Sequence, residues 1–167
     1  MTRIFLFFLL CGCASTNRIE YNTPSPVSTG DIFVGYHEKY NRTELKILLG
    51  VDPTKYEWCA AFVNAILKYN DIPGSESVSD YPLLARSFLS WGETVIGDPV
   101  SGDVVIFPRG REQWKGHVGF YVGEIMVGSI KYYIILGGNQ NNEVSYEYYK
   151  ANTAIDVRRY TGGQGGI

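Results

Sequence analysis

Cys59 is the residue whose type and surroundings most directly suggest chemistry. It lies at the head of a small, apolar, helix-like run in the segment KYEWCAAFVN, residues 55–64. A thiolate is a strong nucleophile, and the positive end of a helix favours the ionised form of a nearby thiol. Free cysteine is also among the most buried residue types and packs well beside alanine. The segment alone leaves both interpretations open, a nucleophile and a packing residue.

The helix that carries Cys59 is predicted to start at residues 52–54 and to end at Tyr69. An aspartate, a proline and a threonine supply the start signals, and NDIPG at residues 70–74 supplies the stop. Apolar side chains occupy nearly the whole circumference, which is typical of a buried helix. We therefore expect a central helix with Cys59 near its N-terminal end.

A nucleophilic cysteine needs a general base, and the chain has two histidines. His37 belongs to a charged segment that is predicted to be a surface helix. His117 lies in GHVGFYVGE, residues 116–124, where apolar residues alternate as in a strand. Gly119 shares the face of His117 and would leave room for a substrate chain. A rigid strand holds a base better than a surface helix, so we favour His117 over the alternative of a strand-end histidine facing solvent.

A third polar group usually orients the imidazole of a cysteine–histidine pair, and an amide oxygen can do so. The segment YYIILGGNQNNEVSYEYY predicts strands at residues 131–136 and 144–149, joined by a turn at residues 137–142. Turn chemistry accounts for every glycine and asparagine in that turn. Spacing does not decide whether Asn139 orients the histidine or is a plain turn residue.

The first fifteen residues, MTRIFLFFLLCGCAS, are typical of an export signal. One arginine precedes a short apolar run that is far below the roughly 20 residues needed to span a bilayer. The residues at 10–13 resemble a bacterial lipobox, which predicts a lipid-modified Cys13 at the new N-terminus. The alternatives are an ordinary signal cleaved near Ser15 and an uncleaved anchor. We expect an exported protein, tethered by lipid to the cell-envelope membrane.

The rest of the chain is predicted to form one domain. Residues 16–30 are rich in Ser, Thr, Asn and Pro and are expected to be a flexible linker, residues 31–160 the folded domain, and residues 161–167 a tail. The chain has 167 residues, 45% of them hydrophobic, and a net charge of −2, which gives no indication of a nucleic-acid surface. We expect a monomer.

Cysteine spacing argues against a metal site and leaves one thiol in the domain. If Cys11 leaves with the signal and Cys13 takes lipid, Cys59 has no disulfide partner in an oxidising compartment. No cysteine–histidine pair has the spacing of a zinc site, and no cofactor is expected. An exported lone thiol needs either burial or a function.

Five motifs occur in an order that resembles a family of small cysteine peptidases from bacteria and phages. The motifs are EWCAAFVNAIL, ARSFLSWG, GDVVIFPRG, GHVGFYVGE and LGGNQNNEVS, and the resemblance spans about residues 35–159. That family belongs with the CHAP (cysteine, histidine-dependent amidohydrolase/peptidase) and NlpC-like wall hydrolases. The resemblance implies an α+β fold with a papain-like core, in which the nucleophile helix packs on an antiparallel sheet that carries the histidine.

The resemblance also implies roles for individual residues. Cys59 matches the nucleophile, His117 the base and Asn139 the residue that orients the base. Many CHAP domains have a glutamate two positions before that asparagine, where this chain has Gly137. This departure puts a fourth, acidic participant in doubt and leaves open whether Gln140 belongs to the site. The GD pair at residues 102–103 is interpreted as structural, and residues 80–92 as a capped second helix.

Together these features predict an enzyme that cleaves a peptide or amide bond of peptidoglycan by a thiol mechanism. Peptidoglycan is the partner that the resemblance implies, and Tyr56, Trp58, Trp114 and Gln140 are the expected substrate-binding residues, although the aromatic ones could equally belong to the core. Two alternatives stay open. One is a wall-binding or assembly lipoprotein that keeps the fold without turnover, and the other is a cysteine peptidase that acts on proteins.

Overall fold

A computed structural model of the chain describes residues 24–162. The predicted export signal, Cys13 and most of the predicted linker lie outside the described residues, as does the end of the tail. Within residues 24–162, no helix is both long and apolar enough to cross a membrane.

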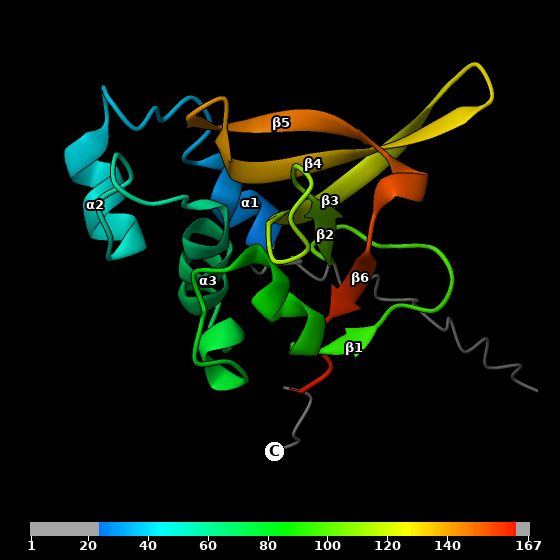
Figure 1. Cartoon of the computed structure of the whole chain (residues 1–167), viewed down its shortest axis with the longest axis horizontal. Coiled ribbons are helices and arrows are strands. Elements are labelled where there is room, and N and C mark those ends of the chain that lie inside the picture. Colours follow the sequence, from blue (N-terminus) through cyan, green and yellow to red (C-terminus); the bar gives the residue numbers. More distant parts are fainter. Residues whose placement is uncertain (1–23, 163–167) are drawn as a thin grey trace, which may run out of the picture.

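The structure is α+β, with one antiparallel sheet and helices gathered at one side of it (Figure 1). The α-helices are α1 (Pro26–Asp31), α2 (Arg42–Leu49) and α3 (Cys59–Tyr69). Three short 3-10 segments are η1 (Ser75–Ser77), η2 (Ala85–Ser90) and η3 (Ala151–Thr153). The strands are β1 (Glu93–Thr94), β2 (Val104–Pro108), β3 (Gly116–Val127), β4 (Ile130–Gln140), β5 (Glu143–Lys150) and β6 (Asp156–Arg159). The sheet has six strands in the order β1-β6-β2-β3-β4-β5.

Alternating side chains of the central strands cover both faces of the sheet. Val118 and Phe120 of β3 pack on the main core with α3, as their period-two spacing predicts. Val105 and Phe107 of β2 enter a second, smaller cluster with Tyr121. Helix α3 packs against β3 and β4, so the nucleophile candidate and the favoured histidine lie on elements in direct contact.

Helix α3 is buried, as predicted, but it starts later than the sequence indicates. Its buried residues include Cys59, Phe62 and Ile66. The predicted start at residues 52–54 is wrong, because Asp52 instead pairs with Arg42 and accepts hydrogen bonds from the N–H and the hydroxyl of Thr54. The consequence is that Cys59 is the first residue of the helix rather than a residue of its second turn.

The folded part begins earlier than predicted, because residues 26–30 of the expected linker belong to helix α1. Ser25 caps this helix through a reciprocal capping box with Ser28. Gly30 is buried, and a Cβ there would lie 2.9 Å from Leu136 Cδ2 and 3.5 Å from Phe62 Cζ. A small residue at this point lets α1 sit directly on α3 and β4, which is a contact that linker composition does not reveal.

The β4–β5 hairpin is longer than predicted and its turn is shorter. Strand β4 continues to Gln140, and the turn consists of Asn141 and Asn142, whose φ values of 52° and 67° match a two-residue type I′ turn. The pairing of β4 with β5 shifts between Gly137 and Gln140, as in a β-bulge, and Asn139 has φ 58°. The prediction that residues 137–142 form the turn is therefore wrong.

Segment 80–92 also departs from the prediction of a capped helix. It contains the 3-10 helix η2 without a side-chain cap. Gly102-Asp103 has a structural role, because the carboxylate of Asp103 accepts two hydrogen bonds from Arg159, each 2.7 Å long, and one from the Val100 N–H. This pair fastens β6 to the start of β2.

Candidate active site

Cys59 lies at the N-terminal end of α3 with its thiol against β3. The N-cap residue Trp58 makes no side-chain hydrogen bond to the first turn, so the first N–H groups of the helix have no cap from that side chain. The backbone N–H groups of Val118 and Ala60 are directed at the thiol. Val118 follows His117 in β3, so the thiol lies beside the strand position that carries the histidine.

Burial raises the pKa of the Cys59 thiol above its ordinary value. The N–H groups of Val118 and Ala60 and the positive charge of Arg109 act in the opposite direction, while Glu57 adds to the increase. Cys59 as a whole is 3% exposed. The expectation that the helix end favours the thiolate is therefore outweighed by burial, and the resting thiol is protonated.

His117 is buried and uncharged at neutral pH. Its pKa is lowered to about 4, chiefly by burial and also by the charge of Arg109, while the hydrogen bond with Gln140 acts in the opposite direction. Its Nε2 lies 3.1 Å from Oε1 of Gln140. An amide oxygen only accepts hydrogen bonds, so this contact requires the proton on Nε2 and leaves Nδ1 as the basic nitrogen.

The amide of Gln140 is held in one orientation. Its Nε2 donates to the backbone oxygen of Ser145 at 2.6 Å and to that of Gly137 at 3.4 Å. This leaves Oε1 to accept from His117 and from the hydroxyl of Tyr149, which lies 3.1 Å away. Gln140 is thus the residue that orients the imidazole.

Asn139 makes no hydrogen bond to His117, although both residues border the same cleft, so the structure does not place it in the orienting role that the resemblance implies. Its Nδ2 donates to Oε2 of Glu57 at 2.7 Å. The physical reason is the bulge: the register shift between Gly137 and Gln140 changes which side chain of β4 faces the histidine. Asn139 is instead directed toward the loop that precedes α3.

Tyr149 is a site residue that sequence reasoning missed. Its ring stacks on His117, with ring centroids 5.4 Å apart and planes 19° apart. Burial and the nearby Glu147 raise the pKa of Tyr149 to about 12, so its hydroxyl keeps the proton that it donates to Gln140. In the sequence, Tyr149 is marked only by its position in the alternating pattern of β5. Because the chain has 13 tyrosines, such a position does not single out one of them.

Glycines next to the site permit close packing rather than substrate access. A Cβ on Gly137 would lie 3.2 Å from both His117 Nε2 and Gln140 Oε1, so a side chain there would crowd the bond between them. A Cβ on Gly119 would lie 2.5 Å from Ile135 Cγ2, which shows that β4 fills the space expected for a substrate chain. This face of β3 is therefore closed by β4 at Gly119.

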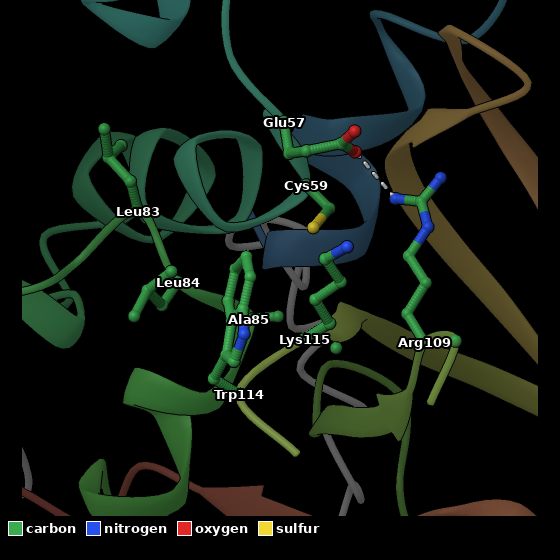
Figure 2. Close-up of a pocket in the computed structure, with 10 residues that line it drawn as sticks. Glu57, Cys59, Leu83, Leu84, Ala85, Arg109, Trp114 and Lys115 are labelled. Carbon is green, nitrogen blue, oxygen red and sulfur yellow. Dashed lines mark hydrogen bonds and ion pairs between the residues drawn. The ribbon is translucent and has the colours of Figure 1, made fainter. Parts of the chain in front are cut away.

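Two clefts border the cysteine and the histidine. Cys59 lines a cleft of about 280 Å³ together with residues of three loops, and Figure 2 shows its sulfur directed into it. The other lining residues are Glu57, Leu83, Leu84, Ala85, Arg109, Gly110, Trp114, Lys115 and Gly116. His117 and Gln140 line a second cleft of about 300 Å³. Arg109 borders both clefts.

Of the three aromatic residues expected to bind substrate, one lines a cleft and two do not. Trp114 lines the first cleft and is 58% exposed. Trp58 is fully buried, bonded through Nε1 to Glu38 and packed against Gly138, so its assignment to a substrate groove is wrong. Tyr56 is exposed but lines neither cleft.

His37 takes no part in either cleft. It forms an isolated bridge with Glu143, and its Nδ1 accepts a hydrogen bond from the Lys39 N–H. It precedes α2 rather than lying on a helix. Of the two histidines, only His117 lines one of these two clefts.

Among residues 24–162, no group of three or more acidic, histidine or cysteine side chains is arranged to hold a metal ion. Comparison of the chain with family models, with curated proteins and with solved structures finds no match. The site is therefore defined by its own geometry.

Proposed function

We propose that the protein is a cysteine peptidase or amidase that cleaves a peptide or amide bond in peptidoglycan. The observation that carries this proposal is the thiol of Cys59 at the start of α3, which accepts from the N–H of Val118, while the preceding residue of β3, His117, has its Nε2 held by Gln140. This arrangement supplies a nucleophile, a base and an orienting group. We also propose that the α+β fold has the papain-like arrangement.

The resting site is a neutral thiol–imidazole pair, so the thiolate must form as the substrate is attacked. Nδ1 of His117 takes the proton of Cys59 while the sulfur adds to the amide carbonyl. The imidazolium then gives this proton to the leaving amine as the C–N bond breaks, which leaves a thioester. Water, deprotonated by Nδ1, attacks the thioester and releases the acid and the thiol.

Backbone and amide groups stabilise the charges that develop during this reaction. The N–H of Cys59 lies at the start of α3 and is suited to bind the oxyanion. The Oε1 of Gln140 accepts from Nε2 and raises the pKa of His117, which stabilises the imidazolium. Without this bond, desolvation would disfavour protonation even more strongly.

The choice of peptidoglycan rests on the resemblance of five motifs to the CHAP and NlpC-like hydrolases. The lipobox-like export signal supports it, because a lipid-anchored Cys13 would hold the domain in the cell envelope close to the wall. The burial of Cys59 and its raised pKa are the observations that favour the alternative, a wall-binding lipoprotein without turnover.

Digestion of purified peptidoglycan separates these functions. We expect the wild-type protein to release new chain ends, which mass spectrometry can assign to a bond, and Cys59→Ala to release none. Binding of Cys59→Ala to the same material should persist. Equal release by both proteins excludes a thiol mechanism, and binding without release by the wild type favours the assembly lipoprotein.

A further inference from the structure

Arg109 is placed to act on any ligand of the site. It follows β2 and borders both the cleft that contains Cys59 and the cleft that contains His117. Its guanidinium side chain is 46% exposed. Within residues 24–162 it makes one hydrogen bond, from Nη1 to Oε2 of Glu57 at 2.9 Å, and so the rest of its donor fork is unused.

Glu57 is a weakly held partner for this arginine. Its side chain is 76% exposed, and the oxygen that contacts Arg109 also accepts from Asn139 at 2.7 Å (Figure 2 shows the ion pair with Arg109). An exposed ion pair of this kind contributes little to stability and is easily exchanged. Glu57 therefore occupies, with one oxygen, a site that a ligand carboxylate would fill with two.

The first cleft is otherwise suited to an acidic ligand with an apolar part. Lys115 adds a second positive charge, although it pairs with Glu112 outside the cleft lining. Leu84 and Trp114 supply exposed apolar surface in the same cleft, and Nζ of Lys115 lies over the Trp114 ring, 5.2 Å from its centroid. The thiol of Cys59 lies in the same cleft.

We propose that Arg109 is a specificity-determining residue that captures a carboxylate of the substrate near the bond to be cleaved, displacing Glu57. The substrate class is therefore an acidic peptide. This inference rests on the proposed function, since it describes the same site. A ligand ammonium group bound by Glu57 is the competing arrangement, and the variants below separate the two.

Alkylation of Cys59 by two nearly isosteric reagents tests the proposal without requiring turnover. Iodoacetate and iodoacetamide both form the sulfur–carbon bond and release iodide, and they differ in carrying a carboxylate or an amide. The ratio of their rates cancels any change in the pKa of the thiol, which Arg109 also influences. We expect Arg109→Gln to lower the iodoacetate-to-iodoacetamide ratio about tenfold or more.

Two further variants sharpen this measurement. Glu57→Gln should raise the ratio, because it removes the internal carboxylate that competes for Arg109. Arg111→Gln, an exposed arginine that lines neither cleft, should leave the ratio at the wild-type value. A ratio unaffected by Arg109→Gln overturns the proposal, and so does a ratio that falls in Glu57→Gln.

Soluble peptidoglycan fragments, either native or with their carboxyl groups converted to carboxamides, give the matching test on turnover. We expect the wild type to prefer the native fragments about 10- to 100-fold in kcat/KM, and Arg109→Gln to lose this preference mainly through KM. Equal cleavage of both forms by wild type overturns the inference while the proposed function stands. Cleavage of neither form overturns the proposed function, and the alkylation ratio then decides whether Arg109 binds carboxylates.

Discussion

Oε1 of Gln140 lies 3.1 Å from Nε2 of His117, and the amide of Gln140 is held in place by the backbone oxygen of Ser145. This bond determines which nitrogen of the histidine carries the proton. It leaves Nδ1 as the base that the proposed reaction requires.

Replacing Gln140 with alanine should lower kcat by about 10- to 1000-fold, because misplacement of a reacting group by about 1 Å can cost on the order of 100-fold. Gln140→Glu keeps an acceptor for Nε2 and should recover part of the rate. Asn139→Ala should stay near the wild-type rate, since Asn139 bonds to Glu57 and not to His117. The measurement is steady-state hydrolysis of peptidoglycan fragments by variants that are first shown to be folded.

Asn142→Ala, in the turn that follows β4, is the matched control for a local effect on the hairpin. Similar losses in Gln140→Ala, Asn139→Ala and Asn142→Ala would contradict a specific role for Gln140. They would reduce the site to a Cys59–His117 dyad.

Tyr149→Phe removes the hydroxyl that donates to Gln140 but keeps the ring that stacks on His117. We expect a fall in kcat of about 2- to 10-fold, the effect of one hydrogen bond, with little change in stability. Tyr149→Ala should lower kcat further, since the imidazole then loses both supports. Thermal unfolding and kcat, measured on both variants, would reveal a merely structural role as a stability loss with an unchanged kcat.

Stability should depend on pH through His117. Its pKa is about 4 in the folded protein and 6.5 in the reference state, so the unfolded chain binds a proton more readily between these values. The contribution of neutral His117 to the free energy of unfolding is fully present above pH 6.5. As the pH falls toward 4 this free energy decreases, by up to about 3 kcal/mol. Urea unfolding at several pH values measures this, with His117→Gln as the variant that lacks it. An identical pH dependence in that variant would argue against a buried, neutral His117.

The reactivity of Cys59 should reflect its burial. We expect the rate of iodoacetamide alkylation to rise with pH through a midpoint above the ordinary thiol value of 9.0. Arg109→Gln should move the midpoint higher and Glu57→Gln should move it lower, because these charges act on the thiol in opposite directions. A midpoint below pH 7 that is the same in the wild type and in both variants would mean that the resting site already holds a thiolate.

The helix of Cys59 and the strand of His117 are predictable from the sequence because their signals are local. A cysteine at the head of an apolar helix and a histidine in an alternating strand are recognisable from residue type and period. Contact between α3 and β3 then follows from two apolar faces that must be buried together. The α+β class is confirmed on the same basis.

Gln140 is not predictable as the orienting residue in this way, because its position depends on contacts between segments that are far apart in the sequence. Two glycines and three asparagines within residues 137–142 give a turn signal, yet β4 continues because Gly138 lets it approach Trp58 and Phe62. A Cβ at Gly138 would lie 2.5 Å from Trp58. The bulge that accompanies this approach brings Gln140, not Asn139, to the histidine.

The central claim is that Cys59 forms a thioester with the substrate, and rapid acid quenching followed by intact-mass measurement tests it most directly. Wild-type protein mixed with soluble peptidoglycan fragments should carry the acyl part of the cleaved fragment on Cys59, and neutral hydroxylamine should remove it. Cys59→Ala should carry no adduct and release no product. Release of the same products by Cys59→Ala at the wild-type rate, with no adduct on Cys59 in the wild type, would contradict the account.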